Sequence, residues 1–110
     1  MILYGIKNCD TVKKARKYLE KHNIAYTFHD FRADGLLEEK VANWLSMVGM
    51  DVLVNKRSTT WKSLSEDEKN AVDIRLICAQ PTLIKRPVLE LDDHIIIGYR
   101  ETEYGDIVSS

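Results

Sequence analysis

ILYGIKNCDTVKKARKYLEK, residues 2–21, is the stretch of sequence that decides the fold. Its first residues, Ile2 to Tyr4, are apolar and prone to form a strand. A helical pattern follows, which begins near Asp10 and runs to about His22. The stretch therefore predicts a strand that leads directly into a helix, with Cys9 at the junction between them.

The remaining segments alternate in a way that defines a topology. Residues 24–31 are rich in aromatic and β-prone residues and predict a second strand, reached by a right-handed crossover if it is parallel to the first. Two apolar runs, residues 88–91 and 94–97, flank turn-prone aspartates and predict an antiparallel hairpin. Residues 101–107 predict a short terminal helix.

The middle of the chain predicts helices. One helix follows Asp34-Gly35, has apolar residues spaced for one buried face and ends at Gly49. The residues of that face are Leu37, Val41, Trp44, Leu45 and Val48. Residues 65–68 form a capping-box pattern before a single further helix that ends before Pro81. That helix is expected to carry Ala71, Ile74, Ile77 and Cys78.

The resulting order is β-α-β, a helical region, then β-β-α. This is the order of a thioredoxin-like α/β fold with a mixed four-stranded sheet. The 110 residues are the size of one domain, and no linker or low-complexity tract divides them. We expect a single domain over residues 1–110, with an inserted helical region at about residues 35–80.

Composition excludes several classes of function. No apolar run approaches the roughly 18 residues of a membrane span, and the N-terminus lacks the pattern of a secretory signal, so a cytoplasmic protein without membrane contact is expected. A net charge of −1 and a pI near 6.3 argue against direct nucleic-acid binding. The two cysteines have no metal-ligand spacing, so no metal site is predicted.

Cys9 is the candidate nucleophile. The first N–H groups of a helix lack intrahelical partners and carry the positive end of the helix dipole, which favours a thiolate. Lys13 lies one turn later on the same helical face. Cysteines in such positions have pKa values lowered from ~8.5 to roughly 3.5–7.5. The alternative is that Cys9 is a small, buried residue that starts a helix and has no chemical role.

Three arginines are candidates for holding an anionic group beside Cys9, because a guanidinium presents a planar fork to carboxylates and oxyanions. In a thioredoxin-like order, the loop that contains Arg86 and Pro87 faces the start of the first helix. Arg100 follows the last strand, and Arg57 lies in a central loop. The alternative for each arginine is a solvated surface charge.

Other reactive residue types have simpler explanations. Cys78 has no cationic neighbours in its helical segment, which favours an inert core thiol over a resolving cysteine. His29 lies in a predicted strand and is more typical of packing than of a catalytic base. Trp61 is expected to be a core anchor, although its basic loop would also suit the border of a ligand groove.

Three motifs together resemble the arsenate reductase/Spx family, and within it the YffB-like branch. They are residues 4–15 (YGIKNCDTVKKA), residues 53–57 (LVNKR) and residues 81–88 (PTLIKRPV). The resemblance implies a thioredoxin-like fold with an inserted helical region and a catalytic or redox cysteine at Cys9. It also implies that Arg86 and Arg100 are counterparts of oxyanion-binding arginines and that Pro87 is a cis-proline.

The chain departs from that family pattern at three positions. Glutaredoxin-linked arsenate reductases have a histidine four residues before the cysteine, where this chain has Gly5, and an arginine in the middle motif, where it has Asn55. Arg57, two positions further on, would substitute only if its loop turned the side chain inward. Spx-type regulators commonly carry a CxxC switch, but the residue three after Cys9 is Val12.

The leading functional hypothesis is a cytoplasmic glutathione-dependent thiol reductase that acts on small-molecule or protein disulfides. Cys9 would be the nucleophile, glutathione or another thiol donor the co-substrate, and Lys13, Arg57, Arg86 and Arg100 the anion-binding groups. No bound metal or nucleotide cofactor is expected. One alternative is a Spx-like regulator that binds RNA polymerase, and another is an arsenate reductase.

Overall fold

The computed structural model describes residues 1–109 and divides the chain into two compact units. The first unit combines residues 1–34 with the residues from Arg86 onward. The second unit is the continuous segment 35–85. In sequence, the second unit is therefore an insertion between the two halves of the first.

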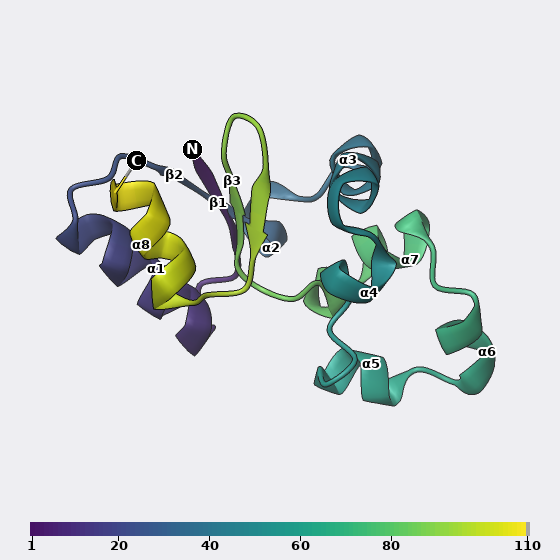
Figure 1. The fold of residues 1–110 in the computed structure, drawn as a ribbon. Coiled ribbons are helices and arrows are strands. Elements are labelled where there is room, and N and C mark those ends of the chain that lie inside the picture. Colours follow the sequence, from purple (N-terminus) through teal and green to yellow (C-terminus); the bar gives the residue numbers. More distant parts are fainter. Residues whose placement is uncertain (110) are drawn as a thin grey trace. The chain divides into compact units, whose positions relative to one another are not determined.

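The first unit is built on a four-stranded sheet with the order β2-β1-β3-β4. Strands β1 (Ile2–Gly5) and β2 (Thr27–Asp30) are parallel, whereas β3 (Val88–Glu90) is antiparallel to both β1 and β4 (Ile95–Ile97). The strand β3, late in the sequence, thus pairs with β1, the first one (Figure 1). This is the predicted mixed sheet of a thioredoxin-like fold.

Helices α1 (Asp10–Lys21) and α8 (Glu101–Ser109) lie together on one side of the sheet (Figure 1). The apolar stripe predicted for α1 is buried at Val12, Ala15 and Leu19. The core between sheet and helices consists of Leu3, Ala15, Leu19, Leu89, Ile96 and Tyr104. The burial of this one face explains why a helix with a polar outer surface forms at this place in the sequence.

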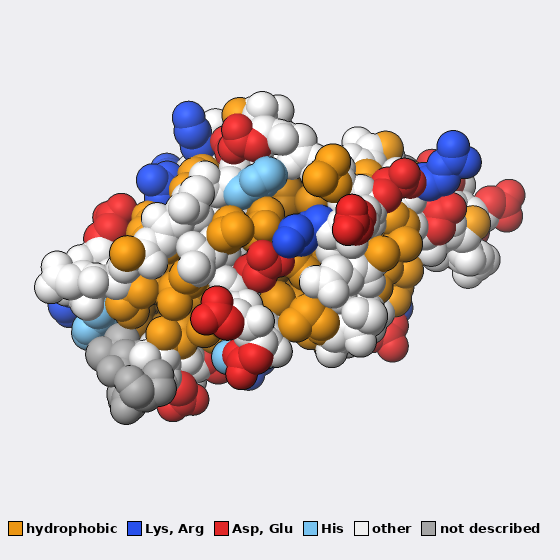
Figure 2. Space-filling model, turned by 90° about the horizontal axis from the view of Figure 1, so that it is seen from above, with side chains coloured by type: hydrophobic (Ala, Val, Ile, Leu, Met, Phe, Trp, Pro, Cys, Tyr) orange, Lys and Arg blue, Asp and Glu red, His pale blue; other side chains and the backbone are white. Residues whose placement is uncertain are grey.

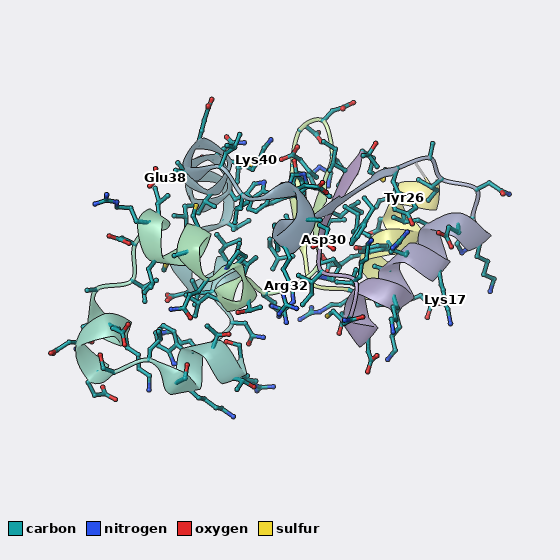
Figure 3. The ribbon with its side chains drawn as sticks, turned by 180° about the vertical axis from the view of Figure 1, so that it is seen from behind. Lys17, Tyr26, Asp30, Arg32, Glu38 and Lys40 are labelled. Carbon is teal, nitrogen blue, oxygen red and sulfur yellow. The ribbon has the colours of Figure 1, made fainter. Side chains whose placement is uncertain are left out.

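Strand β2 is shorter than the predicted 24–31. The chain leaves α1 through Asn23, whose φ is 55°, and the Ile24 N–H still donates to the carbonyl of Leu19 at 2.9 Å. At the other end, the Asp30 carboxylate accepts a hydrogen bond of 2.8 Å from the Arg32 N–H and so caps the short helix α2 (Phe31–Asp34) (Figure 3). The turn after α1 therefore shortens β2 at its start, and the cap of α2 shortens it at its end.

The second unit is helical. It contains α3 (Glu38–Val48), α4 (Met50–Leu53), α5 (Thr59–Ser63), α6 (Glu66–Asn70), α7 (Ile74–Ala79) and the 3₁₀-helix η1 (Pro81–Leu83). The end of α4 is joined to the C-terminal end of the unit by a bridge between Val54 and Ile84 and by a 2.8 Å hydrogen bond from the Lys85 N–H to the carbonyl of Leu53. The segment from Asn55 to Leu83 therefore begins and ends at paired residues.

The prediction of one helix after the capping box was wrong. The capping box itself is present, since Ser65 Oγ accepts from the Glu68 N–H at 3.1 Å and Glu68 Oε1 accepts from the Ser65 N–H at 2.9 Å. The helix that it starts ends at Asn70, and a second one begins where Asp73 Oδ1 accepts from the Leu76 N–H at 2.9 Å. Asp73 therefore starts a new helix, α7, rather than continuing the first.

The buried face predicted for α3 is only partly correct. Val41 and Trp44 are fully buried, and Gly49 ends the helix with a φ of 83°. Leu37, however, is 72% exposed, because it precedes the first turn as the N-cap residue instead of lying on the inner face.

On the face seen in Figure 2, acidic and basic side chains are scattered among hydrophobic ones, and the full sequence has a net charge of −1. Within residues 1–109, no helix has both the length and the hydrophobicity needed to cross a membrane.

Candidate functional site

Cys9 is the N-cap residue of α1. It has extended backbone angles (φ −117°, ψ 121°), and its carbonyl accepts the first helical hydrogen bond, from the Lys13 N–H at 3.0 Å. The thiol is free and half-exposed, and its sulfur accepts no capping hydrogen bond. The sulfur therefore lies where the positive end of the helix dipole meets solvent.

A close contact fixes the turn that presents Cys9. Gly5, the last residue of β1, lies against the side chain of Val12 in the first turns of α1. A Cβ atom added at Gly5 would be 2.7 Å from Val12 Cγ2 and 3.3 Å from Cγ1. Strand and helix can approach this closely only because position 5 has no side chain. The sequence did not predict this contact, since Gly5 was considered only as a departure from the arsenate reductase pattern and as part of the connection to the helix.

Strand register brings three further candidates to the same edge of the sheet. Tyr4 pairs with Val88, and Val88 pairs with Ile97, so the end of β1, the start of β3 and the end of β4 meet there. Pro87 immediately precedes β3, and its carbonyl accepts a 2.8 Å hydrogen bond from the Gly98 N–H. The segments that carry Cys9, Arg86-Pro87 and Arg100 therefore all begin or end at this edge.

The Arg86–Pro87 peptide bond is cis, and Pro87 is buried. Arg86 is half-buried, with its Nε atom inside the protein. A half-buried side chain has less conformational freedom to lose on binding an anion than a fully exposed one. The role of Arg86 in positioning an anionic group stays a prediction.

The other two candidate cations in the first unit, Lys13 and Arg100, are exposed. Lys13 lies one turn after Cys9 on α1. Arg100 precedes α8, and its Nε lies 3.8 Å from Glu103 Oε1 in a solvent-exposed ion pair. Exposed pairs of this kind contribute little to stability, so Arg100 can exchange its partner for an anionic ligand at low cost.

Arg57 belongs to the second unit. It is exposed, and its N–H donates to Asn55 Oδ1 at 3.0 Å within a turn that also holds Ser58. Asn55 thus uses its side chain to shape the loop. A role for Arg57 beside Cys9 stays a prediction.

Cys78 is also in the second unit, on α7. Burial raises the pKa of its thiol, and the negative charge of Glu38, which is labelled on α3 in Figure 3, raises it further. A raised pKa lowers the fraction of thiolate, the form that attacks disulfides. Cys78 therefore has the character of an inert thiol.

His29 takes part in aromatic packing. Its ring centroid lies 4.8 Å from that of Tyr4 and 6.4 Å from that of Phe31. Trp61 contacts the ammonium groups of Lys56 and Lys69, at 5.6 and 6.0 Å from the ring centroid, instead of forming a fully buried anchor. Among the side chains that the structure describes, no three His, Cys, Asp or Glu residues are grouped to hold a metal ion.

Comparisons with known proteins identify the family and support the fold. The model of the ArsC family matches residues 4–107. A solved structure of a YffB protein is 41% identical, covers 97% of both chains and has a TM-score of 0.92. An arsenate reductase (ArsC) related protein from Brucella melitensis is 44% identical, covers 96% of this chain and 91% of its own, and has a TM-score of 0.76.

A regulatory protein is also similar. The global transcriptional regulator Spx of Listeria innocua is 29% identical over 92% of this chain and 81% of its own length. This chain is thus similar both to a protein related to arsenate reductase and to a transcriptional regulator. With a family match from Tyr4 to Ile107 and a YffB protein of nearly the same fold, this chain belongs to the ArsC family, as the three motifs predict.

Proposed function

We propose that this protein is a cytoplasmic thiol–disulfide oxidoreductase with Cys9 as its nucleophile and glutathione as its reductant. The observation that carries the proposal is the placement of Cys9. It is a half-exposed thiol at the start of a twelve-residue helix, at the sheet edge where Arg86 and the cis-proline Pro87 also lie.

The reaction follows from one accessible thiol. The Cys9 thiolate attacks one sulfur of a disulfide, which forms a mixed disulfide and releases the other half as a thiolate. A first glutathione thiolate attacks the Cys9 sulfur and displaces the bound half of the substrate. A second glutathione then attacks the glutathione sulfur of the Cys9 adduct, forms oxidised glutathione and regenerates the Cys9 thiolate. Two glutathione molecules are oxidised for each disulfide reduced.

The chain's own residues have distinct parts in this scheme. Arg86 and Arg100 would hold the carboxylates of glutathione or an anionic group of the substrate, and Lys13 would add positive charge beside the sulfur. Glutathione would resolve the mixed disulfide because Cys78, whose pKa is raised, is a poor attacking thiol. Arg57 would join the anion-binding groups only if its loop approaches the site.

The test is turnover of a small organic disulfide with glutathione, followed through NADPH oxidation by glutathione reductase. Cys9→Ser is expected to lower the rate to that of the uncatalysed reaction. Cys78→Ser is the matched control and is expected to keep full activity. Turnover that survives in Cys9→Ser would overturn the proposal. Arsenate in place of the disulfide tests the arsenate reductase alternative, which a higher kcat/KM for arsenate would support.

A regulator that binds RNA polymerase is the second candidate, and the similarity to Spx over nearly the whole chain favours it. Val12 stands where a second cysteine would complete a CxxC pair, so a disulfide switch within this motif is not available. Binding of the purified protein to purified RNA polymerase, measured at low salt and independent of Cys9, would support this function. Its absence there would count against it.

A further inference from the structure

We propose that the outer face of α1 is a docking surface for a partner protein with an acidic surface around its redox-active cysteine. This inference rests on the proposed function, since it names the class of disulfide that Cys9 meets. It goes beyond that function by extending recognition along α1, from Lys13 to Lys14, Lys17 and Lys21, which have no part in the proposed reaction.

The surface is a ridge of lysines that starts at the cysteine. Lys13, Lys17 and Lys21 follow Cys9 at intervals of four residues, which is one row along a helix surface. Lys14 lies beside this row, and all four lysines are exposed. Figure 3 shows Lys17 on the side of α1 turned away from the sheet. From Lys13 to Lys21 the ridge extends about 12 Å.

Two acidic residues of α1 lie near the ridge, the exposed Asp10 in the first turn and Glu20 near the end. Glu20 Oε1 accepts a hydrogen bond of 3.0 Å from the Tyr26 hydroxyl, which in turn accepts from Arg16 Nε at 3.1 Å. The guanidinium of Arg16 also lies 4.4 Å from the centre of the Phe28 ring. Within the described part of the chain, none of the four ridge lysines forms an ion pair.

The ridge costs its own helix some stability. Lys13, Lys17 and Lys21 repel one another at intervals of four residues, and Lys13 opposes the helix dipole near its start. Asp10 in the first turn and Lys21 in the last turn favour the dipole and offset part of this cost. A row of like charges is a local conflict of the kind that is expected at a functional surface.

Charge complementarity identifies the partner. Exposed lysines attract a negatively charged surface and raise the rate of association. Because the ridge begins at Cys9, an acidic patch that docks on it brings a neighbouring disulfide to the sulfur. A short ridge on a protein with a net charge of −1 suits a compact acidic protein patch better than the extended backbone of a nucleic acid.

Two synthetic helical peptides test this proposal. Each carries one cysteine as a mixed disulfide with thionitrobenzoate, and they differ only in six Glu or six Gln residues along one face. Cys9 attacks the peptide sulfur, forms the peptide–Cys9 disulfide and releases coloured thionitrobenzoate. In a Cys78→Ser background, the Glu peptide is expected to react about 10-fold faster at low salt. The difference should disappear in 0.5 M NaCl, where charges are screened.

Two double variants show which surface causes the faster reaction of the Glu peptide. Lys17→Glu together with Lys21→Glu is expected to remove the advantage of the Glu peptide without changing the rate of the Gln peptide. Lys62→Glu together with Arg75→Glu is the control, since it changes the net charge equally at two exposed positions of the second unit. Equal rates for both peptides, or equal losses in both double variants, would overturn the docking proposal.

Binding to Cys9→Ser, measured by fluorescence anisotropy with peptides whose cysteine is blocked, separates this proposal from the proposed function. Binding that prefers the Glu peptide supports docking even if Cys9 proves unreactive. Fast exchange without preference supports the reductase and refutes docking. Tighter binding of an oligonucleotide of equal charge, lost in the ridge variant, would assign the ridge to nucleic acid and also refute the proposal.

Discussion

Replacing Gly5 by alanine tests the contact that sets the geometry of the Cys9 turn. The new Cβ would lie 2.7 Å from Val12 Cγ2, well inside van der Waals contact. Val12 cannot easily rotate away, because β-branched side chains in helices have one strongly preferred rotamer and because Val12 is fully buried. Strand and helix must therefore separate to accept the methyl group.

The expected cost can be estimated from opposing effects. Overpacking of a core position costs about 1–3 kcal/mol. Gly→Ala in an extended strand recovers about 0.4–1 kcal/mol by restricting the unfolded chain. We therefore expect Gly5→Ala to lower the free energy of unfolding by about 1–2 kcal/mol. With a urea m-value of about 1.5 kcal/mol/M, the midpoint of unfolding falls by about 1 M.

A double-mutant cycle isolates the contact. Val12→Ala alone removes two buried methyl groups and is expected to cost roughly 2 kcal/mol. In the double variant the new methyl at position 5 occupies part of the space vacated by Val12, so the two costs should not add. A coupling energy of about 1 kcal/mol or more, measured by urea unfolding, is expected. Additive costs, or a Gly5→Ala variant as stable as the original chain, would refute the reasoning.

Three other perturbations have definite expected outcomes. Tyr104 is fully buried, and its hydroxyl has no hydrogen-bond partner among the described residues, while burial raises its pKa. Tyr104→Phe should therefore leave the free energy of unfolding, measured by thermal denaturation, unchanged or raise it by up to about 1 kcal/mol. A decrease of that size would mean that the Tyr104 hydroxyl does form a stabilising hydrogen bond. Ser65→Ala removes the capping box with Glu68 and should cost about 1 kcal/mol in urea unfolding, whereas an unchanged midpoint would mean that α6 contributes nothing to global stability. Because burial and Glu38 raise the pKa of Cys78, its alkylation should become fast only above the range of an ordinary thiol, near pH 8.5, and Glu38→Gln should lower that midpoint. A Cys78 midpoint at or below 8.5, resolved from Cys9 by peptide mass spectrometry, would contradict this assignment.

Local patterns predicted most of the first unit. The apolar run before Cys9, the periodicity of α1 and the paired runs of the hairpin each carry their own signal, because strands and amphipathic helices alternate apolar and polar residues with different periods. Two parallel strands joined by a helix need a crossover connection, and two strands joined by a short turn pair antiparallel. The mixed sheet follows from these local features without knowledge of distant contacts.

The second unit was harder to predict because its helices are short. Residues 65–79 keep an apolar spacing that fits one helix, yet Asp73 caps a new one. A cap competes with helix continuation through a single hydrogen bond, and the apolar pattern does not reveal which of the two prevails. The predicted burial of Leu37 was wrong for a similar reason. The sequence does not fix the exact residue at which α3 begins, and Leu37 precedes the first turn, where its side chain is exposed to solvent.

For the site, the sequence predicted the position of Cys9 but not the contact that supports it. Gly5 and Val12 are separated by the turn and the first residues of the helix, and neither shows by itself that it touches the other. Only the distance from a Cβ built at position 5 to Val12 Cγ2, 2.7 Å, shows that a larger residue at position 5 would displace Val12 in this backbone.

The order of the strands also has a consequence for the protein during its synthesis. Strand β3, which pairs directly with β1, and the Arg86-Pro87 turn are translated only after the whole second unit. A nascent chain therefore carries Cys9 on a strand–helix–strand fragment whose sheet still lacks β3 and β4. The last quarter of the polypeptide must be synthesised before the Arg86-Pro87 turn and strands β3 and β4 can assemble beside Cys9. Every newly made molecule therefore passes through a stage in which Cys9 is present but this edge of the sheet is not yet formed.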